Sequence, residues 1–270
     1  MRLSHASLLG GLVLILALVA VPSLARTVGS PAELRFEPKA SVGRQTVSDS
    51  VDWSGFAVTS KLATPRSSVV SAVRGSWTVP TVSETTAGYS AVWVGIDGYS
   101  DNTVEQIGTE QNWTGGSPVY YAWYEMAPRL PHTIARVYPG DSMSASVTYL
   151  GSNRFTLTIS DSTAGHSSAF ETTQTMVALR ESAEWIVEAP SSTHSVLPLA
   201  NFGLVRFTGA KVTIGGHSGT ISDSTWQSDL ITMASRRGAV QAQPSALSSE
   251  GSSFTVKWEN SHLPPNSSLS

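Results

Sequence analysis

The sequence predicts an all-β protein, an antiparallel sandwich or a barrel, from three observations. From Asp52 onward, short segments alternate apolar residues with hydroxyl or other polar residues, which is the pattern of half-buried strands. Turns rich in Gly, Ser, Asp and Asn separate these segments. No stretch carries an apolar stripe of helical period over more than about two turns. Many short strands at close spacing favour a sandwich or a barrel.

The clearest strands lie in residues 142–160. Met143, Ala145, Val147 and Tyr149 alternate with hydroxyl residues, and the alternation resumes after a Gly-Ser-Asn break, which predicts a hairpin. Similar segments that we expect to be strands are 69–79, 90–97, 119–126, 169–176, 204–208, 211–214 and 254–258. The glycine-rich residues 215–219 are interpreted as a turn rather than a nucleophile elbow, because they lack the Gly-x-Ser-x-Gly spacing.

The N-terminus predicts export from the cell. Arg2 and His5 precede an apolar run over residues 8–21, and Pro22 and a small-x-small pattern ending at Ala25 follow it. A membrane anchor is the alternative, but the run is shorter than the roughly 20 residues that span a bilayer. We therefore expect a signal peptide over 1–25 and a secreted protein. Residues 26–48 form either a leader, such as a propeptide, or an unstructured arm; the β domain covers 49–260, and 261–270 is a polar tail.

The composition excludes several classes of function. A net charge of −3 provides no basic field for nucleic acid, and a hydrophobic fraction of 40% is too high for a disordered chain. The chain has no cysteine, so disulfides, thiolate nucleophiles and cysteine-ligated metals are impossible. It also lacks the Asp-[Ser/Thr]-Gly triplet of pepsin-type enzymes and the His-Glu-x-x-His helix of zinc hydrolases. We expect no metal and no cofactor.

Three segments, 91–98, 120–128 and 182–188, concentrate aromatic residues, carboxylates and amides. Strand alternation places Trp93, Gly95 and Asp97 on one face of the first segment, opposite an apolar face. In the same way, the second segment presents Tyr121, Trp123 and Glu125, and the third presents Glu184, Ile186 and Glu188. Aromatic floors with carboxylates between them predict an open, solvent-filled groove for an extended polymer, peptide or sugar.

These segments resemble the glutamic peptidases, or eqolisins, which are exported, acid-acting, pepstatin-insensitive endopeptidases. The motifs that carry the resemblance are WVGIDG at 93–98, QIG at 106–108, AWYE at 122–125 and AEWIVE at 183–188. Weaker matches occur at 52–55, 77–80 and 202–208, so the motifs follow the family order over about 200 residues. The resemblance implies a sandwich of two large, curved antiparallel sheets of concanavalin-like or jelly-roll type.

The resemblance also implies which residues act. The catalytic pair of the family, a glutamine and a glutamate, falls on Gln106 and Glu184, and substrate-binding positions fall on Trp93, Asp97, Trp123 and Glu125. The chain departs from the family pattern at Glu110 and Tyr121, where the family often has Asp, and in having no disulfide. These departures leave the pair intact and affect the expected substrate preference.

A glutamate and a glutamine suit peptide hydrolysis in acid. The carboxylate takes a proton from the attacking water and returns it to the leaving nitrogen. The amide donates N–H groups to the developing oxyanion and does not titrate at low pH. We therefore expect ionised Glu184 to activate water and Gln106 to stabilise the tetrahedral intermediate without a covalent intermediate. The expected protein is a monomer that acts on polypeptides and binds neither nucleic acid nor, once the signal is removed, membranes.

Two other functions fit the same aromatic and acidic faces. A sandwich-type glycoside hydrolase would use paired carboxylates such as Glu125 and Glu184 and would give Gln106 no necessary role. A lectin-like module would bind in the groove without catalysis. An acid digest of denatured protein and of β-glucan separates the three, because only a peptidase releases amines and only a glycosidase releases reducing ends.

Overall fold

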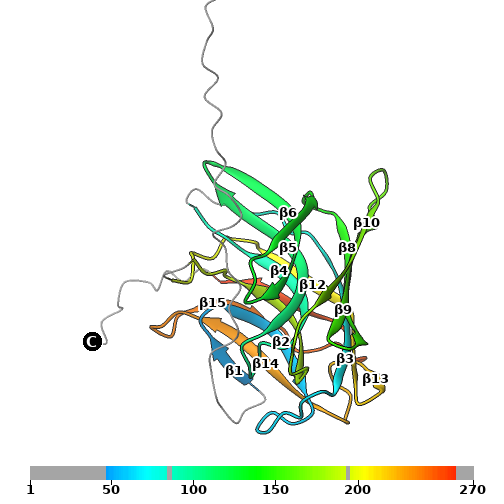
Figure 1. Ribbon diagram of the computed structural model, residues 1–270. Coiled ribbons are helices and arrows are strands. Elements are labelled where there is room, and N and C mark those ends of the chain that lie inside the picture. Colours follow the sequence, from blue (N-terminus) through cyan, green and yellow to red (C-terminus); the bar gives the residue numbers. More distant parts are fainter. Residues whose placement is uncertain (1–46, 84–86, 193–194, 260–270) are drawn as a thin grey trace, which may run out of the picture. The chain divides into compact units, whose positions relative to one another are not determined.

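The structure is a computed structural model that describes residues 47–83, 87–192 and 195–259. In these ranges the chain is all β, and none of them contains a helix able to cross a membrane. Figure 1 shows the strands, which are β1 Val47–Ser50, β2 Trp53–Thr59, β3 Val70–Thr78, β4 Ala91–Ile96, β5 Val104–Thr114, β6 Ser117–Ala127, β7 His132–Arg136, β8 Ser142–Gly151, β9 Arg154–Asp161, β10 Ser168–Thr175, β11 Ser182–Glu188, β12 Leu204–Ile214, β13 His217–Gly219, β14 Gln227–Ala234, β15 Val240–Pro244 and β16 Phe254–Trp258. The predicted signal peptide, most of the predicted leader and the predicted tail lie outside the described residues.

The alternating segments form strands as predicted. The β8–β9 hairpin turns at Ser152 and Asn153, whose φ angles of 52° and 59° are those of a tight left-handed turn. The segments 204–208 and 211–214 belong to one strand, β12, which has a register shift between Thr208 and Lys211. The glycine turn at 215–216 joins β12 to β13, as expected.

The strands form two packed layers, so the predicted sandwich is confirmed. One layer, the site layer, has the order β14-β2-β11-β4-β5-β6-β7, and the other, the hydroxyl layer, has the order β10-β9-β8-β3-β12. The two layers are not separate sheets, because β15 and β16 connect them into one hydrogen-bonded path. Apart from the parallel pair β1–β14, the strand pairs are antiparallel.

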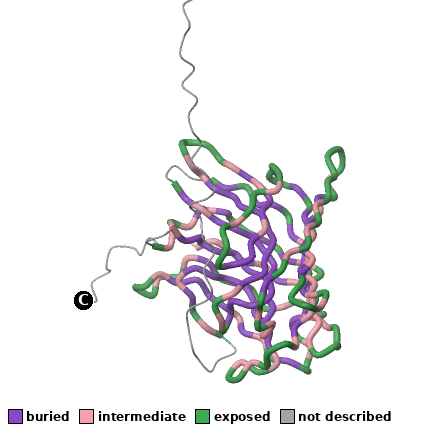
Figure 2. Tube along the Cα trace, in the orientation of Figure 1, coloured by how far each residue is buried: buried purple, intermediate pink, exposed green. Residues whose placement is uncertain are grey.

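The main hydrophobic core lies between the layers. The inner face of the hydroxyl layer contributes residues such as Val73, Val147 and Phe207, and the site layer contributes Val94 and Trp185. Figure 2 shows the buried residues along the strands and the exposed ones in the connecting turns. A second, smaller hydrophobic cluster covers the other face of the site layer. That face also carries the predicted site residues.

Strand β1 begins inside the segment that the sequence analysis assigned to the leader. Val47 pairs with Leu230 and Ser48 with Ile231 of β14, and the Ser48 hydroxyl donates a 2.5 Å hydrogen bond to Asp229. The last two residues of the predicted leader are therefore part of the β domain.

Candidate active site

Strand register places the two predicted catalytic residues in one transverse row of the site layer. Glu184 of β11 lies opposite Gly95 of β4, Gly95 lies opposite Gln106 of β5, and Gln106 lies opposite Glu125 of β6. Directly opposed residues of antiparallel strands point to the same face of a sheet. These side chains, here called the polar row, therefore share the face that is turned away from the main core. The proposed pair requires a shared face, which the register gives, and also access of water to both side chains.

Gly95 leaves a gap between the members of the pair. Two strand spacings of about 4.8 Å put the Cα atoms of Glu184 and Gln106 roughly 9–10 Å apart. A Cβ atom at Gly95 would lie 2.8 Å from the Trp93 ring and 3.2 Å from the Gln106 Cβ. The carboxyl and the amide thus face each other across a position without a side chain, beside the edge of the Trp93 ring.

A second row of large apolar side chains runs beside the polar row. Ile186 lies opposite Trp93, and Gly108 lies between Trp93 and Trp123. The indole of Trp93 donates a 2.8 Å hydrogen bond to Glu188 and packs edge-on against Trp53 with 5.0 Å between ring centroids. Glycine at position 108 gives the two indoles room. This row holds Trp93 in place next to the pair.

The amide of Gln106 is oriented by its neighbour in the row. Its Nε2 donates a 2.7 Å hydrogen bond to Oε2 of Glu125. Its Oε1 has no hydrogen-bond partner among the described residues. One amide N–H and the carbonyl oxygen of Gln106 therefore stay available to a water or a substrate carbonyl.

The site is closed in this structure. Glu184, Gln106 and Trp93 are 0% exposed, and Trp123 and Glu125 are 1% and 2% exposed. The expectation of a solvent-filled groove is therefore wrong for this structure. The physical reason is that the tryptophans do not project into solvent: they pack on one another and on neighbouring aliphatic side chains in the second hydrophobic cluster.

Burial determines the protonation of the carboxyls on this face. Removal from water raises the pKa of Glu184 well above its ordinary value, and the nearby carboxyls of Asp97, Asp101 and Glu105 raise it further. The pKa of Glu188 is raised in the same way by burial, against the hydrogen bond from Trp93. In the closed site, Glu184 is therefore a neutral acid over the acid pH range.

Asp97 has a different role from the other predicted residues. Strand β4 ends at Ile96, and Asp97 has a left-handed φ of 72°, so the alternation that was expected to align it with Trp93 stops before it. Its carboxylate accepts hydrogen bonds of 2.6 Å from the backbone N–H groups of Arg180 and Glu181. Asp97 thereby fixes the chain that enters β11, three residues before Glu184.

This face carries further polar residues that were not predicted as site residues, although alternation had already placed Glu188 on the face of Glu184. Glu110 and Glu188 lie on either side of Ala91 in a third row. Each follows its catalytic neighbour on the same strand, Gln106 or Glu184, by an even number of residues, and this alternation indicates that they share its face. Asp229 shares the polar row through Ala57 and accepts a 2.8 Å hydrogen bond from Tyr99. No pattern indicated Asp229, because β14 does not alternate.

One group of histidine and carboxylate side chains lies close together elsewhere in the fold. Within the described ranges, the histidine and carboxylate side chains close enough to share an ion are Asp141 just before β8, Asp161 at the end of β9 and His166 on the turn after β9. They already contact one another, with 3.1 Å between His166 Nδ1 and Asp161 Oδ2.

Residues 51–258 match the model of the peptidase A4 family. The chain belongs to this family. The resemblance to eqolisins found in the sequence is thereby confirmed.

Curated relatives and solved structures agree with the A4 assignment. The chain is 31% identical over 178 residues to aspergillopepsin-2 of Aspergillus niger and 30% identical over 157 residues to scytalidopepsin B of Scytalidium lignicola. These matches cover 57% and 54% of this chain and 63% and 60% of the relatives, so the chain spans about three fifths of their length.

Two solved structures share the fold. Scytalido-glutamic peptidase with a peptide-based transition state analog matches with a TM-score of 0.64 and 23% identity, over 77% of this chain and 98% of that one. Aspergilloglutamic peptidase from Aspergillus niger matches with a TM-score of 0.55 and 29% identity, over 64% of this chain and 99% of that one.

Two glycines of this A4 chain give a matched pair of predictions. A Cβ at Gly108 would lie 2.2 Å from the backbone oxygen of Val92, so Gly108→Ala must separate β4 from β5. A Cβ at Gly95 would first meet a side-chain atom, on the edge of the Trp93 ring at 2.8 Å, and its nearest backbone contact would be 3.2 Å away. We expect Gly108→Ala to lower the free energy of unfolding by about 3 kcal/mol or more, and Gly95→Ala to cost much less. Denaturant titration of both variants measures the difference, and equal losses would contradict the geometry.

Proposed function

We propose that this chain is a secreted endopeptidase that works in acid through Gln106 and Glu184. The observation that carries the proposal is the polar row, in which both side chains share one face on either side of Gly95. Family membership supports the same conclusion. The apolar row with Trp93 and Trp123 provides surfaces for the side chains of a polypeptide, which we propose as the substrate.

The proposed reaction follows from the groups in the row. Ionised Glu184 takes a proton from a water, whose oxygen attacks the scissile carbonyl carbon. The free N–H of Gln106 donates to the oxyanion, and Glu125 keeps the amide in the orientation that allows this. Protonated Glu184 then gives its proton to the nitrogen, the C–N bond breaks and no covalent intermediate forms.

Asp97 and Glu125 are proposed to act through other residues. Glu125 is hydrogen-bonded to Gln106, and Asp97 is hydrogen-bonded to the backbone that leads into β11. Both are therefore positioning residues, and Trp93 and Trp123 are the side chains proposed to contact substrate. This arrangement does not favour a glycosidase, because Glu125 and Glu184 are three strand spacings apart in the row.

The test is a digest at pH 3–4 with denatured protein and, separately, β-glucan as substrates. We expect new amino groups from the protein and no reducing ends from the glucan. Release of reducing ends would support the glycosidase, and binding without release of either product would support a lectin-like module. Recovery of the protein from culture medium, starting after Ala25, tests secretion.

The buried pair has a consequence for maturation. Glu184 must be ionised and reached by water to act as a base, whereas in this structure it is buried and its pKa is raised. We propose that residues 26–48 are an inhibitory propeptide whose four basic residues are attracted to the carboxyls around the polar row. The bond from Ser48 to Asp229 ties the end of this segment to the polar row. N-terminal sequencing after acid activation tests this, and full activity with Arg26 retained would contradict it.

A further inference from the structure

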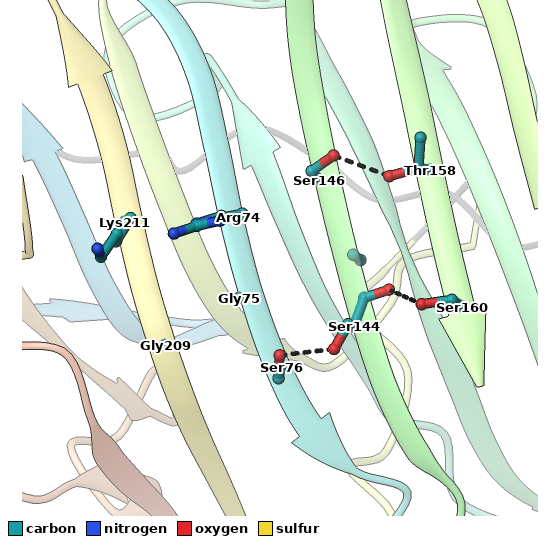
Figure 3. Close-up of a pocket in the computed structure, with 10 residues that line it drawn as sticks. Arg74, Gly75, Ser76, Ser144, Ser146, Thr158, Ser160, Gly209 and Lys211 are labelled. Atoms are coloured by element: carbon teal, nitrogen blue, oxygen red, sulfur yellow. Dashed lines mark hydrogen bonds between the residues drawn. The ribbon is translucent and has the colours of Figure 1, made fainter. Parts of the chain in front are cut away.

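A shallow groove crosses the outer face of the hydroxyl layer, on the opposite side of the main core from the active site. Its volume is about 370 Å³, and Figure 3 shows its lining. The side chains that line it from β3, β8, β9 and β12 are short or cationic, namely Arg74, Ser76, Ser144, Ser146, Thr158, Ser160 and Lys211. A second groove of about 210 Å³ shares Ser76 and Ser144 with it and extends to Arg206. Together they form one polar channel across the strands, here called the hydroxyl groove.

The hollow follows from the local sequence. Serine and threonine occupy the outward positions of β8 and β9, where longer side chains would fill the space. On β12 the register shift places Gly209 at the groove with a φ of 60°, and no atom lies within 4 Å of the position that its Cβ would take. The floor of the groove therefore consists of hydroxyl groups and backbone on neighbouring strands, which lie about 4.8 Å apart.

The hydroxyls form pairs and keep further hydrogen-bonding capacity. Ser76 and Ser144 are 2.7 Å apart and Ser146 and Thr158 are 2.8 Å apart, as the dashed lines in Figure 3 mark. A hydroxyl offers one donor and two acceptor sites, so each pair uses only part of its capacity. The groove can both donate to and accept from a ligand that is rich in hydroxyls.

The cations of the groove are unbalanced. Lys211 lies directly opposite Arg74 in the β12–β3 register, and both are exposed. Like charges directly opposite each other on a sheet are destabilising. Among the ion pairs of the described residues, none joins Lys211, Arg74 or Arg206 to a carboxylate. The acid in the same row is Glu171 of β10, which is separated from Arg74 by Ser146 and Thr158. An anion between Lys211 and Arg74 would relieve their repulsion.

We propose that the hydroxyl groove binds an anionic polysaccharide. The hydroxyls of a sugar can form hydrogen bonds with the serine and threonine hydroxyls of the groove. Its acidic substituents can form ion pairs with Lys211 and Arg74. A peptide fits less well, because both edges of β3 and of β8 are already paired and no backbone is free to add a strand. A neutral sugar fits less well because the larger hollow has no aromatic ring in its lining, and Trp77 beside the smaller hollow is buried and offers no face for stacking. A polymer held here leaves the opposite, active-site face free, so the site would anchor the protein to acidic polymer. This proposal does not depend on the proposed peptidase activity.

The test measures binding of dextran sulfate to the full-length chain at pH 7, where the net charge of −3 disfavours unspecific attachment of a polyanion. Uncharged dextran, inorganic sulfate and poly-L-glutamate are the comparison ligands. We expect dextran sulfate to bind most tightly and the double variant Arg74→Gln, Lys211→Gln to weaken it by about tenfold or more. The matched control is Arg237→Gln, an exposed arginine on the β14–β15 turn, which should change nothing.

Each other result overturns the proposal in a different way. Binding that both variants reduce equally would show a general charge effect, and inorganic sulfate that competes as well as the polymer would show an adventitious ion only. Poly-L-glutamate that binds as tightly as dextran sulfate would point to an acidic peptide.

The thermal midpoint of the double variant should not fall, because the substitutions remove a repulsion. A fall would mean that the two cations are structural.

Discussion

Glu184→Gln is expected to abolish peptide hydrolysis while the protein stays folded. Loss of a group that serves both proton steps should lower turnover by at least about 10³-fold, since general acid–base catalysis contributes roughly 10²–10⁴-fold and glutamine can perform neither step. The fold should tolerate the change because glutamine has the shape of the neutral glutamic acid that burial favours at this position. Turnover of a denatured protein substrate at pH 3–4 measures the effect.

The same substitution has a second readout, which reports the protonation of the buried Glu184 carboxyl. Because Glu184 is buried and its pKa is raised, ionisation at neutral pH costs folding free energy, and glutamine removes that cost. We expect Glu184→Gln to leave the thermal midpoint unchanged at acid pH and to raise it at neutral pH. The matched control is Glu171→Gln, an exposed glutamate of β10, which should affect neither turnover nor midpoint. Near-normal turnover of Glu184→Gln would contradict the proposed pair.

Gln106→Ala separates the role of the amide from that of the carboxylate. Loss of one oxyanion donor typically costs about 10²–10³-fold in turnover. The variant should therefore be weaker than wild type yet measurable, unlike Glu184→Gln. Since Glu125 accepts a hydrogen bond from the Gln106 amide and is proposed to act through it, Glu125→Gln should lower turnover less than Gln106→Ala does.

The sequence predicts strands well where one face of the strand is exposed to solvent. In β8 and β9, buried and more exposed residues alternate, and the period of two is visible in the sequence. Strand β2 was not predicted as a separate strand because all seven of its residues are buried, and β5 is buried from Val104 to Asn112. A strand buried on both faces has no polar side to mark its period.

The sequence predicts on which face of each strand the site residues lie, but it does not predict that they are buried. Alternation places Trp93, Trp123 and Glu184 on the correct side of their strands because each lies inside a regular strand. It fails at Asp97, where the strand has ended and φ is positive. Neither the burial of the pair nor the position of Asp229 in the polar row follows from a local pattern, because both depend on which strands become neighbours.

The full-length protein is expected to be most stable in mild acid and to lose stability as the pH rises. Burial raises the pKa of Asp97 to about 8, and the carboxyl of Asp101 raises it further, against hydrogen bonds from the backbone of Glu181 and Arg180. Burial also raises the pKa values of Glu105, Glu110, Glu184 and Glu188. Each of these groups binds its proton more tightly in the folded than in the unfolded chain. The folded state is therefore favoured below about pH 4, the unfolded pKa range, and this advantage disappears as the pH rises through the raised values.

Few groups of the described chain act in the opposite direction. Backbone and side-chain hydrogen bonds from Thr225, together with the one from His217, lower the pKa of Asp223 to about 2, so its contribution is lost only as the pH falls toward that value. Three of the four ion pairs involve histidine, which is charged only when protonated. Within the described ranges the remaining ion pair is Lys257–Glu259, and it is not part of a larger carboxylate–lysine network that could compensate at neutral pH.

Thermal midpoints of the full-length chain between pH 3 and pH 8 measure this dependence. A shift of one pKa unit is worth about 1.4 kcal/mol, so several raised carboxyls amount to a substantial share of a typical folding free energy. Glu110→Gln gives the matched test, because Glu110 is fully buried but lies outside the catalytic pair: it should raise the midpoint at pH 8 and leave it unchanged at pH 4. A midpoint that climbs steadily from pH 4 to pH 8 would contradict the account, since it requires that these carboxyls ionise more easily in the folded chain than in the unfolded one.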